Sequence, residues 1–533
     1  MSAEKYYDSV VVGAGFSGIY MVYRLQKLGF SVRAYEAGGG VGGTWYWNRY
    51  PGARCDVESL QYSYSFSEEL QQEWKWEEHF SAQPQIQAYA EHVVNRFNLQ
   101  PLIQLETRVT SAHFNESSQL WTVETDRGDV VTCRFCIMAS GVLSAGKLPE
   151  IPGISEFQGS TYHSGQWPHE KVNFKGKRVA VIGTGSSGIQ VIPEIAREVD
   201  SLVVYQRTPN FSIPARNVPM KPEYENNFKS RYAQLRAEAK HTRSGTLYGD
   251  VGTQSALEVQ PEEREQVYAA RWAKGGNHLM YGFTDLITDE RANATAAEFV
   301  RDRIREMVKD PETAAKLLPN DHPIGTKRIC IDTNYYDTYN RPNVKLVDLR
   351  DTPILEITKQ GVRTSEGETP FDCIVFATGF DAMTGALTRI DMKGRGGLGL
   401  KDAWQAGPVN YLGLMVSGFP NMFTVTGPGS PSVLGNMFVA IEQHVDWISD
   451  CLDYLRKSHR TVIEPDPKAQ AEWVAHVNEV AHKTLYPKAN SWYMGANVPG
   501  KPRMFMPYIG GAVQYREKTT QIAERGYEGF VLK

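Results

Sequence analysis

Two glycine-rich turns with the same spacing constrain the fold of this chain more than any other feature. The first is Gly13-x-Gly15-x-x-Gly18 and the second is Gly183-x-Gly185-x-x-Gly188. Between a strand and a helix, the first glycine of such a turn allows the tight bend and the second lets a pyrophosphate approach the backbone. The third lets the helix pack against the strand. We therefore expect two Rossmann-like dinucleotide-binding units in an α/β fold.

The residues around the first turn predict a strand, a helix and a second strand. Residues 9–12 are apolar, residues 19–28 have apolar side chains at helical spacing, and residues 31–36 alternate as a strand that ends in Glu36. The Glu36 carboxylate can accept a hydrogen bond from a ribose hydroxyl, and it would repel a 2′-phosphate. The helix N-terminus would supply N–H groups for the pyrophosphate.

The second unit ends differently. Residues 177–182 and 201–206 are predicted strands, a helix runs on from residue 189, and the second strand is followed by Arg207 and Thr208. A guanidinium and a hydroxyl at this place suit a 2′-phosphate and hence NADP. The simplest interpretation is FAD in the first unit and NADPH in the second.

Residues 42–56 combine four aromatic residues with two arginines and several Gly and Pro residues. Such a loop is typical of backbone folded around a flat ligand. Asp56 alone would more often be a surface or capping carboxylate, but within this loop we expect it to have a role in the site. Residues 215–325 are charged and helical in period, which predicts a helical insertion.

The segment between the two units contains the fingerprint F-x-G-x-x-x-H-x-x-x-W-P, matched by Phe157, Gly159, His163, Trp167 and Pro168. It resembles the signature of the type I flavin-dependent Baeyer–Villiger monooxygenases, which convert ketones to esters or lactones. The likeness covers residues 7–532. The loop 427–434 and the tail 526–531 are most similar to the phenylacetone and steroid monooxygenase branch, which is related to cyclohexanone monooxygenase.

The resemblance implies a domain organisation. Residues 1–142 and 380–533 would form the FAD-binding domain, residues 143–214 and 326–379 the NADP-binding domain, and residues 215–325 the helical insertion. It also implies the chemistry: NADPH reduces FAD, the reduced flavin takes up O2 as a C4a-peroxide, and this peroxide attacks the ketone. Sulfoxidation is expected as a side activity.

The same resemblance gives roles to individual residues. Arg328 would be the catalytic cation over the flavin, held by Asp56, and His163 and Trp167 would couple the positions of the two domains. Lys327 would assist Arg207 at the 2′-phosphate, and Trp492 would lie in a mobile loop over NADP. The full set of expected cofactor-binding residues is Gly13, Gly15, Gly18, Glu36, Thr44, Trp45, Asp56, Gly183, Thr184, Gly185, Ser186, Gly188, Arg207, Thr208, Lys327 and Trp492.

Composition excludes several other classes of protein. The 533 residues carry a net charge of −4, which argues against a nucleic-acid or anionic-membrane partner. There is no apolar run long enough to span a bilayer and no apolar signal core at the start, so we expect a cytoplasmic enzyme. The substrates would be a small-molecule ketone and O2, and the resemblance favours a bulky or aromatic ketone over a small one. We expect a monomer, from the resemblance alone, and no metal site.

Three alternatives remain. A flavin-containing N- or S-hydroxylating monooxygenase shares both nucleotide folds but would not need Arg328. A flavin disulfide reductase needs a cysteine pair beside the flavin, and Cys133 and Cys136 are expected to point to opposite faces of one strand. A catalytically silent flavoprotein would have no reason to keep Asp56, Lys327 and Arg328 together.

Overall fold

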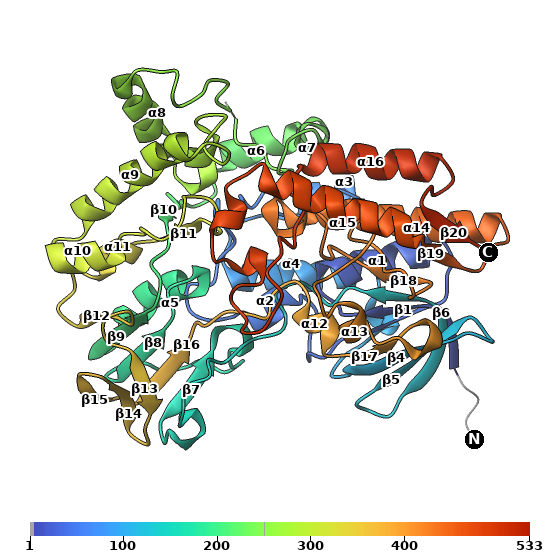
Figure 1. Cartoon of the computed structure of the whole chain (residues 1–533), viewed down its shortest axis with the longest axis horizontal. Helices are drawn as coiled ribbons and strands as arrows, with labels where there is room; N and C mark the ends of the chain where they lie inside the picture. The colour runs from blue at the N-terminus through green and yellow to red at the C-terminus, as the bar shows by residue number, and fades with distance from the viewer. Residues whose placement is uncertain (1–4, 250) are drawn as a thin grey trace.

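The chain folds around two separate β-sheets, each built on one of the glycine turns (Figure 1). The computed structural model describes residues 5–249 and 251–533. The first sheet runs, in spatial order, through β17 (Asp391–Lys393), β4 (Val109–Asn115), β5 (Leu120–Thr125), β6 (Val130–Met138), β1 (Lys5–Val12), β2 (Val32–Tyr35) and β3 (Ile103–Gln104), and β18 (Met422–Thr424) also pairs with β6. The second runs through β12 (Val344–Asp348), β9 (Ser201–Gln206), β8 (Arg178–Ile182), β16 (Cys373–Phe376) and β7 (Ser160–His163). The prediction of an α/β fold with two Rossmann-like units is confirmed.

The strands at the centre of both sheets are parallel, as the glycine turns require. β1 pairs in parallel with β2 and β6, and β8 pairs in parallel with β9 and β16. The last four residues of β1 and of β8 are all buried, so both strands read as continuous apolar runs covered on two faces. Helix α1 (Phe16–Lys27) follows β1 and helix α5 (Ser186–Ala196) follows β8. Both helices begin three residues earlier than the apolar spacing indicates, because each starts within its glycine turn.

The third glycine of each turn is fixed by close packing. A Cβ on Gly18 would lie 1.9 Å from the carbonyl oxygen of Gly13, and a Cβ on Gly188 would lie 2.2 Å from that of Gly183. Gly13 and Gly183 themselves have φ values of +105° and +110°, which disfavour any residue with a side chain. The two units thus use the same backbone geometry to bring helix and strand together.

Helices dominate the segment between β10 (Ser212–Pro214) and β11 (Cys330–Asp332), at the upper left of Figure 1. Capping carboxylates set two helix starts: Asp289 accepts a hydrogen bond from the Arg291 N–H at 2.8 Å, and Asp310 accepts one from the Thr313 N–H at 2.9 Å. The helices of this segment are α6 (Pro222–Ser230), α7 (Tyr232–Lys240), α8 (Pro261–Lys274), α9 (Glu290–Met307) and α10 (Pro311–Leu317). The predicted domain boundaries remain a prediction.

Three C-terminal helices, α14 (Met437–Lys457), α15 (Pro467–His482) and α16 (Ala512–Glu524), lie at the upper right of Figure 1. Arg24 of α1 donates to the Ser449 hydroxyl at 3.0 Å and to the Asp450 carboxylate at 2.7 Å, which fastens α14 onto α1. Among the described residues, no helix combines the length and the apolar character needed to cross a membrane.

A buried histidine on α14 is held in one protonation state. His444 is 1 % exposed, and its Nδ1 accepts the Thr426 N–H at 3.0 Å. Because Nδ1 is an acceptor, Nε2 carries the proton and donates to the Tyr515 hydroxyl at 2.9 Å. Burial, helped by the nearby Arg516 cation, lowers the pKa of His444 to about 3.

We expect acid to destabilise the protein through His444. Its pKa in the folded protein is far below the value of about 6.5 in an unfolded chain, so the unfolded chain binds the extra proton as pH falls below 6.5. The free energy of unfolding should therefore decrease by up to about 1.4 kcal/mol per pH unit from this one group. Urea titrations between pH 7 and pH 4 measure how the free energy of unfolding depends on pH. This dependence should be shallower for His444→Gln than for the wild type. Equal slopes would contradict the assignment.

Candidate functional site

The first glycine turn forms a cradle of bare backbone closed by Glu36. A Cβ on Gly43 would lie 2.8 Å from the Cα of Gly15, so the loop 42–56 meets the turn without side chains between them. Glu36 is 5 % exposed and accepts the N–H groups of Ala14 at 2.7 Å and Gly38 at 2.8 Å. Burial raises the pKa of Glu36, and these N–H donors oppose the shift. Each carboxylate oxygen retains a lone pair for a ribose hydroxyl.

The loop 42–56 continues with the short helix α2 (Thr44–Trp47), which carries two predicted site residues. Thr44 is exposed, whereas Trp45 is buried and donates its indole N–H to the Tyr62 hydroxyl at 3.1 Å. The carbonyl of Trp45 accepts a hydrogen bond from Gln83 at 2.5 Å. These contacts fix the loop against Tyr62 and the start of α4 (Gln83–Arg96), with the Thr44 side chain exposed to a ligand.

Asp56 and Arg328, far apart in the sequence, form a two-pronged ion pair. Arg328 donates from Nε to Asp56 Oδ2 at 2.6 Å and from Nη2 to Asp56 Oδ1 at 2.7 Å. Its Nη1 donates to the Val433 carbonyl at 2.6 Å. Burial opposes the charge of Arg328, but the adjacent Asp56 carboxylate outweighs it and raises the pKa of the guanidinium well above its ordinary value. Arg328 is thus a permanent, oriented cation.

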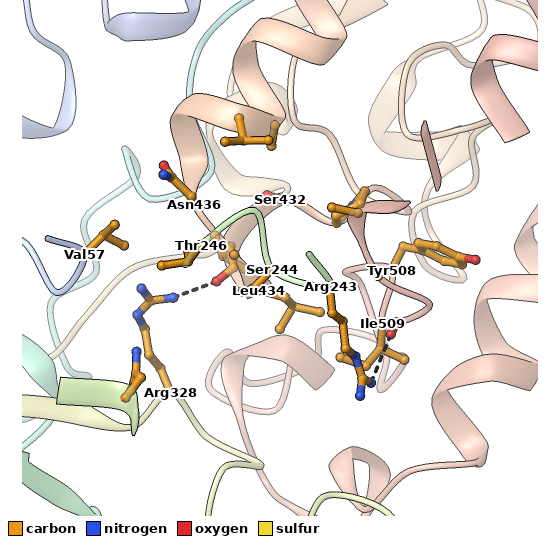
Figure 2. A pocket seen from close by; sticks show the side chains of 18 of the residues that line it. Val57, Arg243, Ser244, Thr246, Arg328, Ser432, Leu434, Asn436, Tyr508 and Ile509 are labelled. Carbon is orange, nitrogen blue, oxygen red and sulfur yellow. Dashed lines mark hydrogen bonds between the residues drawn. The ribbon is translucent and has the colours of Figure 1, made fainter. Parts of the chain in front are cut away.

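A cavity of about 190 Å³ lies beside Arg328 (Figure 2). Its walls come from Val57, directly after the loop 42–56, and from the helical segment, the loop before α14, the start of α14 and the C-terminal loop. Three hydroxyl groups in these walls, on Ser244, Thr246 and Ser432, are buried and have no hydrogen-bond partner among the residues that the structure describes. Such groups indicate a ligand with polar atoms, because an unpaired buried hydroxyl is costly.

The cavity also contains phenols that the sequence did not point to. Tyr493 lines it, whereas its neighbour Trp492 does not. Burial raises the pKa of Tyr493 to about 12, so this phenol remains protonated at neutral pH. The indole of Trp492 packs against the Tyr493 ring, with a centroid separation of 4.2 Å. Its predicted contact with NADP stays a prediction.

The second glycine turn keeps an open face. A Cβ on Gly185 would meet no atom within 4 Å, in contrast to Gly188. Thr184 donates its hydroxyl to the Thr208 carbonyl at 3.1 Å, which ties the turn to the residues after β9. Ser186, the first residue of α5, lies 3.4 Å from the Cys330 sulfur. The N-terminus of α5 and the open Gly185 together suit a pyrophosphate.

Two cations meet at the end of β9. Burial lowers the pKa of Lys327, and the neighbouring Arg207 cation lowers it further, whereas the Asp321 carboxylate opposes the shift. Lys327 Nζ lies 3.6 Å from Asp321 Oδ2, and the other oxygen of Asp321 is 2.6 Å from His322 Nδ1. Arg207 is therefore near enough to Lys327 for their charges to interact, and the structure adds Asp321, which no sequence pattern indicated.

The chain crosses between the two sheets twice, in a first passage that contains residue 147 and a second passage that contains residues 378–382. His163 of the fingerprint connects these two passages. Its Nδ1 accepts the Gly165 N–H at 3.1 Å, which leaves Nε2 to donate to the Lys147 carbonyl at 3.3 Å. The same carbonyl accepts the Thr378 hydroxyl at 2.6 Å, and the Lys147 N–H donates to the Gly379 carbonyl at 3.1 Å. Burial lowers the pKa of His163, so the ring stays neutral and keeps this donor.

The loop that contains Trp492 is fastened to the second passage. Lys501 donates to the Asp381 carboxylate and to the Ala382 carbonyl, both at 2.7 Å. Asn497 donates to the Phe380 carbonyl at 2.7 Å. The loop, the passage and the cavity wall at Tyr493 are therefore parts of one connected region.

The cysteines offer no redox pair. All six are buried and free, and burial raises the pKa of Cys136 to about 12. The expectation that Cys133 and Cys136 face opposite sides of a strand was wrong, since both pack into the same apolar cluster with Trp121 and Met422. Between the two cysteines β6 exchanges β5 for β18 as its neighbour. Neither cysteine lines the cavity.

Comparisons with known proteins agree with this geometry. A family model described as pyridine nucleotide-disulphide oxidoreductase matches residues 10–270. The chain is 42 % identical to acetone monooxygenase (methyl acetate-forming) of Gordonia sp. (strain TY-5), over 98 % of this chain and 99 % of that protein. It is 41 % identical to phenazine N-monooxygenase of Lysobacter antibioticus, over 99 % and 97 %.

A solved structure of oxidized steroid monooxygenase bound to NADP superposes with a TM-score of 0.95 and 50 % identity, over 99 % of both chains. The fingerprint at residues 157–168, the paired Asp56 and Arg328, and full-length relatives at this level of identity lead to one conclusion. The chain belongs to the flavin-dependent Baeyer–Villiger monooxygenase family, as its sequence indicated.

Proposed function

We propose that this protein oxidises ketones to esters or lactones at the expense of NADPH and O2. One oxygen atom is inserted between the carbonyl carbon and the migrating carbon, and the other leaves as water with the two electrons of NADPH. The observation that carries the proposal is the Arg328 guanidinium, held by both Asp56 oxygens and facing a cavity of about 190 Å³. A hydroxylase has no need for such a cation beside its substrate.

We propose that the first unit holds FAD and the second holds NADPH. The bare cradle at Gly13, Gly15 and Gly18, with Glu36 and Thr44, fits the dinucleotide part of FAD, and the unpaired hydroxyls of the cavity fit a polar ring. FAD, once reduced by NADPH, supplies the activation of O2. Arg207, Thr208 and Lys327 would hold the 2′-phosphate of NADPH, and the further residues of the second turn that would hold its pyrophosphate are Gly183, Thr184, Gly185, Ser186 and Gly188.

Arg328 would stabilise the negative charge that develops on oxygen during attack at the ketone carbonyl. Its raised pKa means that it does so without giving up a proton. Asp56 would act as a positioning residue, since its two hydrogen bonds fix the plane of the guanidinium. The Val433 carbonyl occupies a third N–H group and further restricts its rotation. The apolar part of the cavity wall would keep water from the reacting atoms.

The domain division predicted from the sequence is retained as a proposal. Residues 1–142 and 380–533 would form the FAD domain, residues 143–214 and 326–379 the NADP domain, and residues 215–325 the helical insertion. The assignment of β1–β6, β17 and β18 to one sheet and of β7, β8, β9, β12 and β16 to the other supports it. His163, where the chain passes between the sheets, would set the relative position of the two domains together with Trp167, whose ring packs against Tyr50 and Tyr162.

Removal of the His163 ring should slow turnover without loss of cofactor. His163→Ala leaves the Lys147 carbonyl without its imidazole donor, and a small displacement between the nucleotide units costs about 10- to 100-fold in kcat. We expect an unchanged FAD content and a slower reduction of FAD by NADPH in stopped-flow measurements. His113→Ala is the control, because His113 is half-exposed and pairs with Asp391 at 2.8 Å away from the cavity. A reduction rate equal to that of the wild type would refute the positioning role.

Oxidation at sulfur or nitrogen is the second candidate activity. The identity of 41 % with phenazine N-monooxygenase favours testing it. We expect sulfoxidation of thioanisole as a side reaction that tolerates Arg328→Ala better than ester formation does. No nucleic-acid or membrane partner is proposed. We further propose that the protein is a monomer and that it is cytoplasmic. Light scattering on the purified protein tests the monomeric state.

The direct test uses purified, FAD-loaded protein with NADPH and a panel of ketones that includes phenylacetone and cyclohexanone. Gas chromatography of the products should reveal benzyl acetate from phenylacetone or caprolactone from cyclohexanone, in proportion to the NADPH consumed. Hydrogen peroxide as the sole product across the whole panel would refute the proposal. Oxygenation of thioanisole alone would instead favour a hydroxylase.

A further inference from the structure

The cavity beside Arg328 contains a second cation. Of the described residues that line it, two carry a formal charge at neutral pH, Arg328 and Arg243, and both are arginines. The Arg328 charge is compensated by the Asp56 carboxylate. His444, the histidine in the wall, is neutral because burial lowers its pKa to about 3. The cavity therefore has an excess of positive charge, and Arg243 is its source.

Arg243 has no compensating carboxylate in the described part of the chain. It takes part in none of the ion pairs found within 4.0 Å among those residues. The hydrogen bond that its guanidinium makes there goes from Nη2 to the Ile509 carbonyl, at a long 3.4 Å (Figure 2). A guanidinium has five N–H donors, so most of them are left for a ligand or for water.

The position of Arg243 is nevertheless defined. Its carbonyl accepts the Ala512 N–H at 2.8 Å, which docks the residue on the first turn of α16. Its side chain then passes Gly511, where a Cβ would lie 3.1 Å from Arg243 Cγ and where φ is +95°. Glycine at 511 thus gives the arginine room to lie along the cavity wall. Arg243 is an exposed residue, so its remaining N–H groups are open to a ligand that enters the cavity.

We propose that the substrate of this protein is a ketone that carries a carboxylate, with the carbonyl beside Arg328 and the carboxylate on Arg243. A carboxylate accepts two parallel hydrogen bonds from a guanidinium, and such a pair is stronger than a hydrogen bond between neutral groups. The rest of the wall supports a chain or ring between the two groups, since apolar side chains such as Ile329, Leu434 and Val439 line the same space. The inference rests on the proposed ketone oxidation and names its substrate class.

The test compares oxo acids with their methyl esters. The probes are 4-oxopentanoate, 6-oxoheptanoate and 8-oxononanoate, each beside its methyl ester, and the readout is kcat/KM for the formation of the oxygenated product. For at least one chain length the wild type should prefer the acid by about 10-fold, and the preference should shrink in high salt. In Arg243→Met the ratio of kcat/KM for the acid to kcat/KM for the ester should fall to about 1. This fall should come from a lower kcat/KM for the acid, whereas kcat/KM for the methyl ester should change by less than about 3-fold. Arg243→Lys should keep part of the preference.

Two results would overturn the proposal while leaving the ketone oxidation intact. One is a wild type that oxidises every methyl ester as well as its acid. The other is an acid preference that survives in Arg243→Met, which would place the carboxylate on a different group. Failure to oxygenate any ketone of the panel would overturn both proposals. Arg127 lies in the exposed turn between β5 and β6. Arg127→Met is the matched control, and it should leave the acid-to-ester ratio of kcat/KM unchanged.

Discussion

Replacement of Arg328 by lysine should slow ester formation by at least about 10²-fold while NADPH still reduces the flavin. Lysine keeps the charge but cannot reach both oxygens of Asp56 and the Val433 carbonyl at once, as the guanidinium does at 2.6–2.7 Å. Loss of one preorganised donor at a developing oxyanion costs about 10²- to 10³-fold. We expect at least this loss in the rate of ester formation, with Arg328→Ala lower still. Reduced flavin should then return its electrons to O2 as hydrogen peroxide.

The control separates this effect from a general loss of folding. Arg178 makes a comparable two-pronged pair with Asp372, at 2.8 Å, on the surface of the second sheet. Arg178→Lys should leave ester formation unchanged. The rate of ester formation by Asp56→Asn should lie between those of the wild type and of Arg328→Lys, because an amide at residue 56 weakens the hydrogen bonds to the guanidinium without removing both. An Arg328→Lys protein that still makes ester at the wild-type rate would show that the cation has no catalytic role.

The second large effect concerns the choice between NADPH and NADH. In the double variant Arg207→Ser with Lys327→Ala, both cations at the end of β9 are gone. Charge-assisted contacts to phosphate are worth about 1.5–3 kcal/mol each, so KM for NADPH should rise by at least about 10²-fold. KM for NADH should change little, because NADH has no 2′-phosphate. Steady-state kinetics with both nucleotides measures the two values directly.

Each single variant should account for part of the loss. The effect of Lys327→Ala is expected to be the smaller one, because Lys327 lies 3.6 Å from Asp321 and shares its charge with that carboxylate. Arg197→Ser, at the end of α5 and paired with Glu194, is the control. If the double variant raised KM for NADH as much as for NADPH, the two cations would serve the common part of the nucleotide and not the 2′-phosphate.

Much of the fold could be predicted from the sequence because its signals are local. The G-x-G-x-x-G turns and the apolar runs beside them are continuous in sequence, and the expected strand 201–206 coincides with β9. The helix starts at Phe16 and Ser186 were placed too late, since helical backbone begins inside the glycine turn before any apolar spacing is visible. The alternation argument for Cys133 and Cys136 assumed one regular strand, whereas both side chains pack into one apolar cluster where β6 exchanges β5 for β18 as its neighbour.

The cavity could not be predicted in this way. Its walls join Val57, Ser244, Arg328, Ser432 and Tyr493, which come from segments far apart in the chain. The pairing of Asp56 with Arg328 was expected only through the family resemblance. The place of Tyr493 in the cavity wall and the contact between Lys147 and His163 depend on how loops pack, and neither has a sequence pattern of its own.

The most direct test of the account follows a labelled oxygen atom. Wild-type protein and the Arg328→Lys variant, each loaded with FAD, are supplied in parallel with NADPH and phenylacetone under ¹⁸O2. The products of both reactions are analysed by mass spectrometry. We predict benzyl acetate from the wild type with one ¹⁸O atom, in the oxygen that links the two carbon groups, and at least about 10²-fold less of it from the variant in the same time. Unlabelled ester, or labelled ester in equal amount from the variant, would contradict the central claim that Arg328 supports oxygen insertion at this cavity.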